Sequence, residues 1–327
     1  MDKVRIGTLG AARITPQALV APARKLERAE VAAVAARDPA RARRFAERHG
    51  IPRVHDSYEE LVADPELDAV YVPLPNSLHA QWTLAALRAG KHVLCEKPFA
   101  SNQAQAEQVA AEARSSGLVV MEAFHWRYHP MAERMVELAR GGSLGDLQRL
   151  SAWVCFPLPF PGNIRYRYEL GGGATMDAGC YAIHMCRTLA GAEPKVVSAR
   201  AKLASPQVDR AMEAELSFPD GARARIACSL FSSRLLKVAA VLEGSAGRLE
   251  ANNPLRPQIG GRIRLSSSGW VRTERFRAEA TYYYQLAAFV AAVAEGRPTL
   301  TPPEDSVANM AVIDAVYRAA GLRPRGA

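Results

Sequence analysis

Residues 4–15 read VRIGTLGAARIT, and this stretch decides the fold class. The run Val4–Leu9 is apolar, as expected for a buried strand, and Gly10 follows it directly. A helical pattern begins a few residues later. A strand, a glycine turn and a helix at the start of a βαβ series are typical of a dinucleotide-binding domain, although the same residues would also suit an ordinary strand-to-helix turn.

The turn matches the fingerprint G-x-G-x-x-G only at its first position. Gly10 is the first glycine, whereas Ala12 and Thr15 occupy the other two places. Small residues allow backbone N–H groups to approach a pyrophosphate at a helix N-terminus, and Ala12 is still small. The residues expected to contact the cofactor in this turn are Gly10, Ala11, Ala12, Arg13 and Ile14.

Strand-like and helical patterns alternate over the first 125 residues. Further apolar runs lie at Val31–Ala36, Leu67–Val72, His92–Glu96 and Leu118–Ala123. Asp38 and Pro39 suit the N-cap and first position of a helix that ends before Gly50, and Ser57 with Glu60 forms a capping-box pattern. This alternation predicts βαβ units and a doubly wound parallel sheet.

The second half of the chain has a different pattern. Alternating segments lie at Gln148–Phe156, Val196–Leu203, Met212–Phe218, Ala222–Phe231 and Lys237–Glu243. They predict an antiparallel sheet with one covered face. Helical patterns lie at Pro130–Arg140, Ala174–Ala190, Tyr282–Glu295 and Glu304–Ala320. The predicted fold is α/β, with a Rossmann domain at residues 1–125. An α+β domain on an open, mostly antiparallel sheet follows at residues 126–327, its last helix able to pack back on the first domain.

Composition excludes several classes of protein. The chain has 327 residues, 49% of them hydrophobic and 23% charged, which suits two globular domains and argues against disorder or a coiled coil. The net charge of +9 is scattered along the chain, so nucleic-acid binding is not expected. Neither a membrane span nor a signal peptide is apparent, and a cytoplasmic protein is expected. Five cysteines without a CxxC motif indicate reduced, mostly buried thiols and no metal site.

The end of the second predicted strand bears on the choice of cofactor. Ala36 cannot accept a hydrogen bond from a ribose hydroxyl, whereas Arg37 can bind a 2′-phosphate or stack on adenine. Alternatively, Arg37 is a solvated residue and Asp38 only an N-cap. The sequence favours NADP, with NAD as the alternative.

Two further motifs follow predicted strands. Residues 73–79 read PLPNSLH, and residues 96–98 read EKP. Ligands of open α/β sheets bind at the carboxyl ends of the strands, although a lone lysine is more often a surface residue. The cofactor-contact candidates in these motifs are Leu74, Pro75, Asn76, His79, Glu96, Lys97 and Pro98.

Residues 171–184 read GGGATMDAGCYAIH. Asp177, Tyr181 and His184 are spaced by four and three residues, which predicts that they share one face of a helix. The glycines before them would let backbone and substrate come close. His184 alone would also suit a helix core. Arg165, just before the glycines, is a candidate substrate contact or a surface-loop residue.

Together these motifs resemble the Gfo/Idh/MocA family, the group of glucose–fructose oxidoreductases and inositol dehydrogenases. The resemblance extends from residue 4 to about 190. It rests on the Gly10 turn, residues 73–79, residues 90–98 (GKHVLCEKP), residues 122–130 (EAFHWRYHP) and residues 171–181 (GGGATMDAGCY). It implies a Rossmann domain, a second domain whose open sheet often forms the oligomer interface, and NAD(P)-dependent oxidation or reduction of a sugar or polyol. A homodimer or homotetramer is expected.

The resemblance also implies roles for individual residues. The catalytic lysine of the family corresponds to Lys97, and the Lys97–Pro98 peptide is expected to be cis. Tyr181 stands where inositol-dehydrogenase-like members have histidine. This tyrosine places the chain nearer the branch of dihydrodiol and xylose dehydrogenases and sugar ketoreductases. Trp126 and Arg127 are expected to line the cofactor cleft.

The resulting hypothesis assigns Tyr181 as acid and base, Lys97 as the group that lowers its pKa, and Asp177 as substrate orienter. The roles of Lys97 and Tyr181 in this proton transfer could also be exchanged. Arg165, Asp177, Tyr181 and His184 are the candidate substrate contacts. Two alternatives remain open: a glucose–fructose-type enzyme that retains its cofactor, and a non-catalytic NADP-binding sensor.

Overall fold

The computed structural model describes residues 3–233, 235–277 and 279–326, which form two compact units. The first unit comprises the chain up to Ala100, with Ala104–His125 and Tyr282–Val307. The second comprises Ser101–Gln103, Trp126–Thr281 and the chain from Ala308. Each unit has its own sheet.

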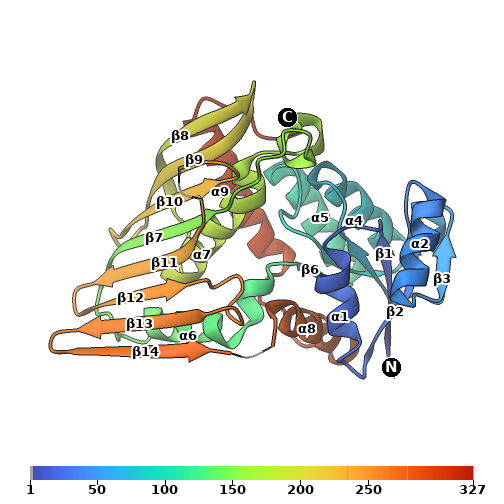
Figure 1. The fold of residues 1–327 in the computed structure, drawn as a ribbon, viewed down its shortest axis with the longest axis horizontal. Helices are drawn as coiled ribbons and strands as arrows, with labels where there is room; N and C mark the ends of the chain where they lie inside the picture. Colours follow the sequence, from blue (N-terminus) through green and yellow to red (C-terminus); the bar gives the residue numbers. More distant parts are fainter. Residues whose placement is uncertain (1–2, 234, 278, 327) are drawn as a thin grey trace. The chain divides into compact units, whose positions relative to one another are not determined.

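The first unit is built on a six-stranded parallel sheet (Figure 1). Its strands are β1 (Val4–Leu9), β2 (Ala29–Ala35), β3 (Arg53–His55), β4 (Ala69–Val72), β5 (His92–Cys95) and β6 (Val120–Glu122). Their order is β3-β2-β1-β4-β5-β6, so the direction of winding reverses at β1, which pairs with both β2 and β4. This arrangement confirms the predicted Rossmann sheet.

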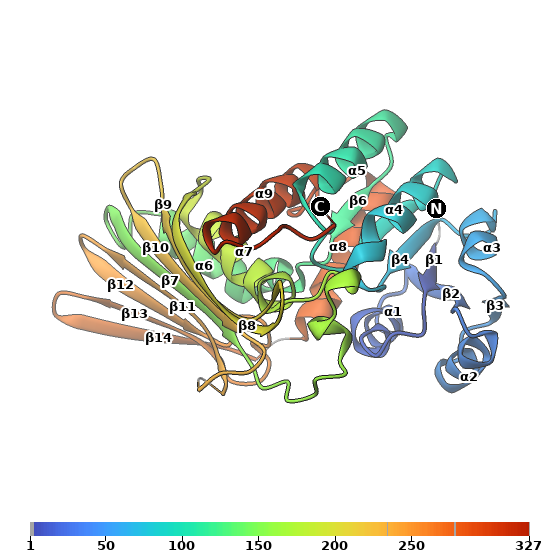
Figure 2. The same cartoon turned by 90° about the horizontal axis from the view of Figure 1, so that it is seen from above.

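Helices cover both faces of this sheet. In Figure 2, α4 and α5 lie on one face and α1 on the other, as right-handed crossovers require when winding reverses. The helices of this unit are η1 (Pro16–Val20), α1 (Ala21–Ala23), α2 (Pro39–His49), α3 (Tyr58–Ala63), η2 (Asn76–Leu78), α4 (His79–Arg88), α5 (Gln103–Ser116) and α8 (Thr281–Glu295). Helices η3 (His125–Tyr128) and α9 (Pro303–Ala319) begin in this unit, and most of their residues belong to the second unit. Across the described ranges, no helix has the length and apolar character needed to cross a membrane.

The predicted helix caps are confirmed. The side chain of Asp38 accepts a hydrogen bond from the backbone of Ala40 at 2.9 Å, and α2 ends at Gly50 in the left-handed conformation. Ser57 accepts from the backbone of Glu60 at 3.0 Å. Local hydrogen bonds of this kind fix helix ends independently of the tertiary fold.

Helix α8 belongs to the first unit, which corrects the expected division of the chain at residue 125. The rings of His125 and Tyr282 lie 4.2 Å apart. Arg28 pairs with Glu295, the last residue of α8, at 2.5 Å. The sequence gives no sign of this return because the helical pattern of α8 does not reveal which sheet it covers.

The second unit contains an eight-stranded sheet in the order β14-β13-β12-β11-β7-β10-β9-β8. Its strands are β7 (Leu147–Cys155), β8 (Lys195–Ser205), β9 (Val208–Ser217), β10 (Arg223–Ser229), β11 (Lys237–Gly244), β12 (Gly247–Asn252), β13 (Gly261–Ser267) and β14 (Trp270–Phe276). Strand β10 pairs with β7 in parallel and all other pairs are antiparallel, so the sheet is mixed. The sequence did not predict β3, β12, β13 or β14.

One face of this sheet is covered by helices (Figure 2). The remaining helices are α6 (Pro130–Arg140), η4 (Ile164–Tyr166), η5 (Tyr168–Leu170), η6 (Thr175–Gly179) and α7 (Cys180–Ala190). Along β10, Ala224, Ile226 and Cys228 are buried whereas Arg223 and Arg225 are exposed. This confirms the predicted alternation. The five cysteines are free and buried, also as predicted.

Candidate active site

The turn after β1 presents unpaired hydrogen-bond donors. Gly10 adopts φ +95°, a backbone conformation that suits glycine. Among the described residues, nothing accepts a hydrogen bond from the backbone N–H groups of Ala11, Ala12, Arg13 or Ile14. The hydroxyl of Thr15 is buried and also has no partner there. Four free N–H groups before a helix fit an anionic phosphate, so the turn fits the pyrophosphate of a dinucleotide.

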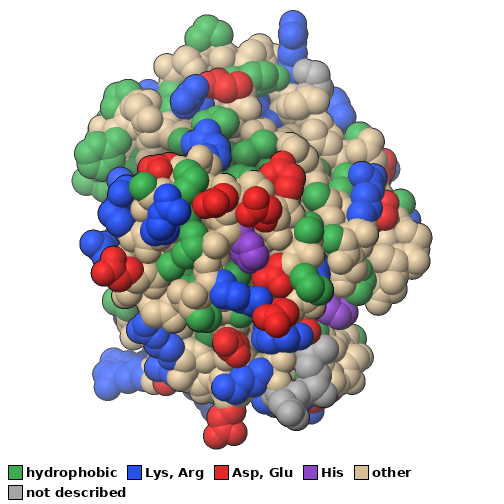
Figure 3. Space-filling view, turned by 90° about the vertical axis from the view of Figure 1, so that its right-hand side faces the viewer, with side chains coloured by type: hydrophobic (Ala, Val, Ile, Leu, Met, Phe, Trp, Pro, Cys, Tyr) green, Lys and Arg blue, Asp and Glu red, His purple; other side chains and the backbone are tan. Residues whose placement is uncertain are grey.

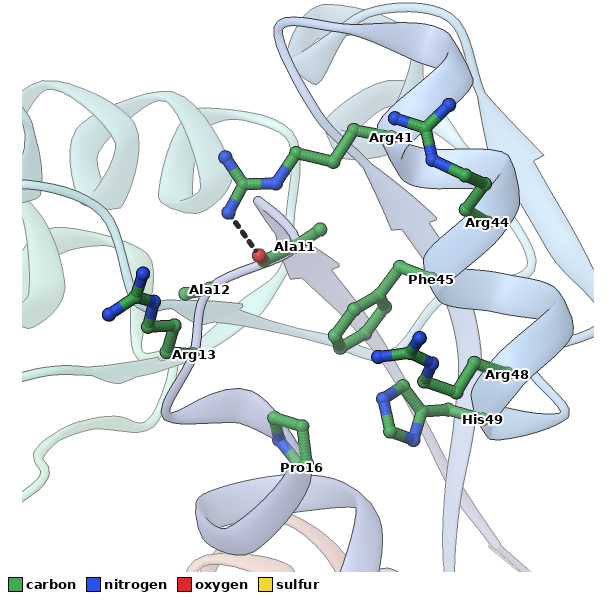
Figure 4. Close-up of a pocket in the computed structure, with 9 residues that line it drawn as sticks. All are labelled: Ala11, Ala12, Arg13, Pro16, Arg41, Arg44, Phe45, Arg48 and His49. Carbon is green, nitrogen blue, oxygen red and sulfur yellow. Dashed lines mark hydrogen bonds between the residues drawn. The ribbon is translucent and has the colours of Figure 1, made fainter.

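A pocket of about 410 Å³ opens beside this turn (Figure 4). Its lining comprises Ala11, Ala12, Arg13, Pro16, Arg41, Arg44, Phe45, Arg48 and His49. Arg41 donates to the carbonyl of Ala11 at 2.6 Å, which holds its guanidinium beside the turn. The carboxylate of Asp38 lies 3.9 Å from Arg44. Four arginines against one peripheral carboxylate make this pocket suitable for an anion.

Sequence reasoning singled out Arg37 and missed the arginines of α2. Arg37, Arg41, Arg44 and Arg48 follow at spacings of four, three and four residues, which is the repeat of one helix face. The pocket lining includes the last three and does not include Arg37. The signal was present in the sequence, because a run of arginines at helical spacing can be recognised without a structure.

The surface that carries α2 and β3 is not uniformly basic. Figure 3 shows positive and negative side chains interspersed on this face. Arg53 pairs with Glu66 at 2.6 Å and with Asp64 at 2.9 Å, and Arg43 lies 3.7 Å from Asp56. The attraction for an anion is therefore local to the pocket.

His79 connects the two loops that follow β4 and β5. Its ring nitrogens lie 2.7 Å from the carbonyl oxygen of Pro98 and 2.8 Å from that of Leu74. Burial lowers the pKa of His79, the two carbonyls oppose that shift, and the charge of Lys97 adds to it. The side chain has no exposed surface, so the structure gives His79 the role of holding these loops.

The Lys97–Pro98 peptide is cis, which confirms the expectation from the family resemblance. Lys97 is partly exposed, whereas Glu96 is buried and accepts a hydrogen bond from the hydroxyl of Tyr71 at 2.7 Å. Leu74, Pro75 and Asn76 are partly exposed at the tip of the preceding loop. Lys97 is thus the residue of its motif that keeps an accessible charged group.

In the second unit, two candidate substrate residues form an ion pair. Arg165 Nε lies 2.7 Å from Asp177 Oδ2, and the Arg165 side chain is 41% exposed. Asp177 and Tyr181 are buried to more than nine-tenths. The structure therefore brings Arg165 and Asp177 together, although they are separated by the glycine segment.

The helix that carries Asp177 and Tyr181 is irregular. Thr175–Gly179 form a π-helix, with i to i+5 hydrogen bonds, and the α-helix begins at Cys180. Asp177 therefore lies in the π-helical part, and the expectation that it shares one helix face with Tyr181 and His184 stays a prediction. Only Tyr181 and His184 lie in the α-helical part. Single π-helical turns within α-helices occur often at functional sites.

His184 is 1% exposed and contacts Trp126. The indole N–H of Trp126 donates to Nδ1 of His184 at 3.1 Å, and the two rings are in edge-on contact at 5.6 Å. Trp126 has no exposed surface, while Arg127 is partly exposed. Trp126 and His184 therefore form part of the interior of the second unit.

The fold and these residues define an oxidoreductase with a dinucleotide-binding Rossmann domain. Residues 4–124 match the model of the oxidoreductase family with an NAD-binding Rossmann fold, and residues 132–250 match the GFO/IDH/MocA C-terminal domain. The chain belongs to this Gfo/Idh/MocA family.

Three similar proteins indicate its branch. The chain is 38% identical to D-xylose 1-dehydrogenase (NADP(+)) 2 of Haloferax volcanii over 96% of both chains. It is 37% identical to trans-1,2-dihydrobenzene-1,2-diol dehydrogenase of Xenopus laevis over 62% of both. A solved structure of a 3-ketoreductase from Actinomadura kijaniata with NADP and TDP-benzene has 31% identity, covers 98% of both chains and has a TM-score of 0.89. These matches confirm the predicted branch.

Proposed function

We propose that this protein is an NADP-dependent dehydrogenase or reductase that acts on the CH–OH or C=O group of a sugar, polyol or related molecule. The four unpaired N–H groups of Ala11–Ile14 are the observation that carries the proposal, because they suit the pyrophosphate of a dinucleotide. The names of the xylose dehydrogenase and the 3-ketoreductase support both the cofactor and the substrate class.

The preference for NADP over NAD rests on charge at the end of β2. Ala36 offers no acceptor for a ribose hydroxyl, and the Asp38 carboxylate already caps α2 through Ala40. Arg41 and Arg44 line the adjoining pocket and can pair with a 2′-phosphate. Arg37 remains a further candidate for this phosphate.

The proposed chemistry assigns one task to each of three side chains. When bound, the nicotinamide would supply or accept the hydride. Tyr181 exchanges a proton with the substrate oxygen, and Lys97 supplies the positive charge that makes a phenol a better base near pH 7. Asp177, held by Arg165 at 2.7 Å, accepts hydrogen bonds from substrate hydroxyls and fixes their orientation. Lys97 and Tyr181 could exchange their roles.

The test is a substrate screen followed by one substitution. Aldoses, inositols, dihydrodiols and keto-sugars would be assayed with NADP(H) and NAD(H), following the absorbance of the reduced ring. With the best substrate, Tyr181→Phe should lower kcat by roughly two to four orders of magnitude because the proton-transfer group is lost. The Kd for NADPH should stay within about twofold of the unmodified protein.

Two results would contradict this assignment. Near-normal kcat in Tyr181→Phe would remove the tyrosine from the chemistry. NADPH binding without turnover of any compound in the panel would instead favour a non-catalytic sensor.

We also infer a homodimer or homotetramer that uses the uncovered face of the eight-stranded sheet. Apolar side chains with exposed surface occur on the two edge strands: Val197 on β8, and Trp270 and Val271 on β14, of which one points to each face of the sheet. Exposed apolar groups on an open sheet favour self-association. Sedimentation equilibrium would measure the mass, and a monomer at micromolar concentration would contradict the inference.

A further inference from the structure

A fully buried ion pair lies beside the glycine segment of the second unit. Asp209 on β9 and Arg325 have no exposed surface, and Oδ1 lies 3.1 Å from Nη2. A buried ion pair often stabilises a fold no more than apolar residues of similar size, because removing both charges from water offsets their attraction. Stability alone is therefore a poor explanation for this pair. Its hydrogen bonds point to a different role.

The carboxylate of Asp209 is saturated with hydrogen bonds. Its Oδ2 accepts from both the backbone N–H and the hydroxyl of Thr175, each at 2.7 Å. Its Oδ1 accepts from the hydroxyl of Tyr317 at 2.9 Å and from Arg325. Burial and the charge of Asp209 raise the pKa of Tyr317 well above its usual value, so its hydroxyl remains a donor. Together these hydrogen bonds fix Thr175, the first residue of the π-helix Thr175–Gly179.

Arg325 fixes the residues just before that turn. Its Nε donates to the carbonyl of Gly172 at 2.6 Å. Its guanidinium lies 4.2 Å from the ring of Tyr317 and 5.0 Å from that of Tyr168, and its own carbonyl accepts from Asn102 at 2.7 Å. The side chain is thus held on several sides and has little freedom to move.

The glycines are required by this packing. Gly173 adopts φ +136°, and a Cβ there would overlap Asp209 Oδ1 and lie 2.7 Å from the Tyr317 oxygen. A Cβ at Gly172 would lie 2.7 Å from the carbonyl oxygens of Arg165 and Arg167. These glycines admit neighbouring protein atoms, whereas the sequence suggested that they make room for substrate.

The segment connects this buried cluster to the proposed catalytic residues. The N–H of Gly173 donates to the carbonyl of Arg165 at 2.8 Å, and its carbonyl accepts from the N–H of Asp177 at 3.1 Å. A displacement of Gly173 would therefore shift both members of the Arg165–Asp177 ion pair. Tyr181 follows one turn later on the same helical segment.

We propose that Asp209 and Arg325 are positioning residues for the reaction, which fix Gly171–Thr175 and through it Asp177 and Tyr181. The inference rests on the proposed function, in which Asp177 and Tyr181 act on the substrate. Neither positioning residue touches the substrate. Loss of a hydrogen bond in the cluster should therefore affect turnover and leave cofactor binding unchanged.

The decisive experiment compares two variants of one residue. Thr175→Val keeps the shape of the side chain and removes its hydrogen bond to Asp209, whereas Thr175→Ser keeps the hydroxyl. We expect kcat to fall about 10-fold in Thr175→Val, with a shifted pH profile, and to stay within about twofold in Thr175→Ser. The Kd for NADPH should stay unchanged in both. Tyr317→Phe, which removes another donor to Asp209, should resemble Thr175→Val.

A matched control separates positioning from general stability. Arg134 and Glu274 form a two-bond ion pair in the same unit, with both N–O distances at 2.9 Å, and neither belongs to the glycine segment. Glu274→Gln should lower Tm without lowering kcat. Equal losses of kcat in Glu274→Gln and Thr175→Val at equal loss of Tm would overturn the inference, as would normal kcat in both Thr175→Val and Tyr317→Phe.

These experiments also distinguish failure of the positioning role from failure of the proposed function. If Tyr181→Phe loses activity while the Thr175 and Tyr317 variants keep it, the function stands and the positioning role falls. If Tyr181→Phe keeps full activity, the proposed function itself fails. Asp209→Asn adds a stronger perturbation, and the Thr175 pair remains decisive should that variant not fold.

Discussion

Two turns in this molecule lead from a glycine into a π-helix. They differ in whether their N–H and hydroxyl groups form hydrogen bonds within the protein. After Gly10, the N–H groups of Ala11–Ile14 and the hydroxyl of Thr15 have no acceptor or donor among the described residues. After Gly173, the N–H and hydroxyl of Thr175 both bind Asp209. The same local backbone form therefore suits ligand binding where its donors stay open, and positioning where the protein itself occupies them.

The largest expected effect concerns the occupied turn. Gly173→Ala should destabilise the protein by about 4 kcal/mol, because φ is unfavourable for alanine and the added methyl overlaps the buried cluster. Urea unfolding at pH 7 measures this change. A loss below about 1 kcal/mol would mean that the cluster can move aside, and the contrast between the two turns would disappear.

The two units should also respond differently to acid. Burial lowers the pKa of His129 to about 4, and the nearby backbone of Glu279 partly opposes that shift. Its Nδ1 must stay unprotonated to accept from Met131 at 3.0 Å and cap α6. The unfolded chain binds a proton below pH 6.5, so stability should fall by up to roughly 3 kcal/mol as the pH drops from 6.5 to 4.

Urea unfolding between pH 4 and pH 7 tests this dependence, with His129→Gln as the control. The control should show a flatter curve in that range. In the first unit, burial raises the pKa of Asp68, but hydrogen bonds from Arg5 outweigh it and lower the pKa overall. That contribution is lost only below about pH 4. An unchanged slope in His129→Gln would remove His129 as the cause.

A charge placed in the open turn should affect binding and leave stability nearly unchanged. Ala12→Glu sets a carboxylate among the free N–H groups that suit the phosphates. We expect the Kd for NADPH, measured by fluorescence titration, to rise about 100-fold through like-charge repulsion. Tm should change by no more than about 2 °C. Unaltered NADPH binding would show that this turn is not the phosphate site.

The smallest effect concerns selectivity between cofactors. Arg41→Met should reduce the preference for NADPH over NADH about 10-fold, since one ion pair with the 2′-phosphate is lost. Arg43→Met is the matched control, because Arg43 lies on the same helix, faces Asp56 and does not line the pocket. Equal loss of preference in both variants would point to the general charge of α2 instead.

Features with local causes could be predicted from the sequence. The caps at Asp38, Gly50 and Ser57 depend on residues at most four positions away, and the structure contains all three. The strand alternation along β9 and β10 follows from burial of one sheet face. The cis peptide before Pro98 came from the family resemblance and not from residue spacing.

Features that depend on residues far apart in the sequence could not be predicted in this way. The π-turn at Thr175 is fixed by Asp209, 34 residues away, and no periodicity in the sequence connects them. Strand β13 does carry a local signal, because exposed arginines alternate with buried Ile263 and Leu265, whereas β14 is mostly exposed and its sequence resembles a loop. The return of α8 to the first unit likewise depends on packing that its own residues do not specify.

The Asp209–Arg325 pair has a practical consequence for recombining this protein with its relatives. The two residues are 116 positions apart, so most crossover points in the second half of the gene separate them. A chimera that inherits one charge and an apolar residue at the other position would enclose an unpaired ion, at a cost of about 3–5 kcal/mol. Productive chimeras should therefore carry both residues from the same parent.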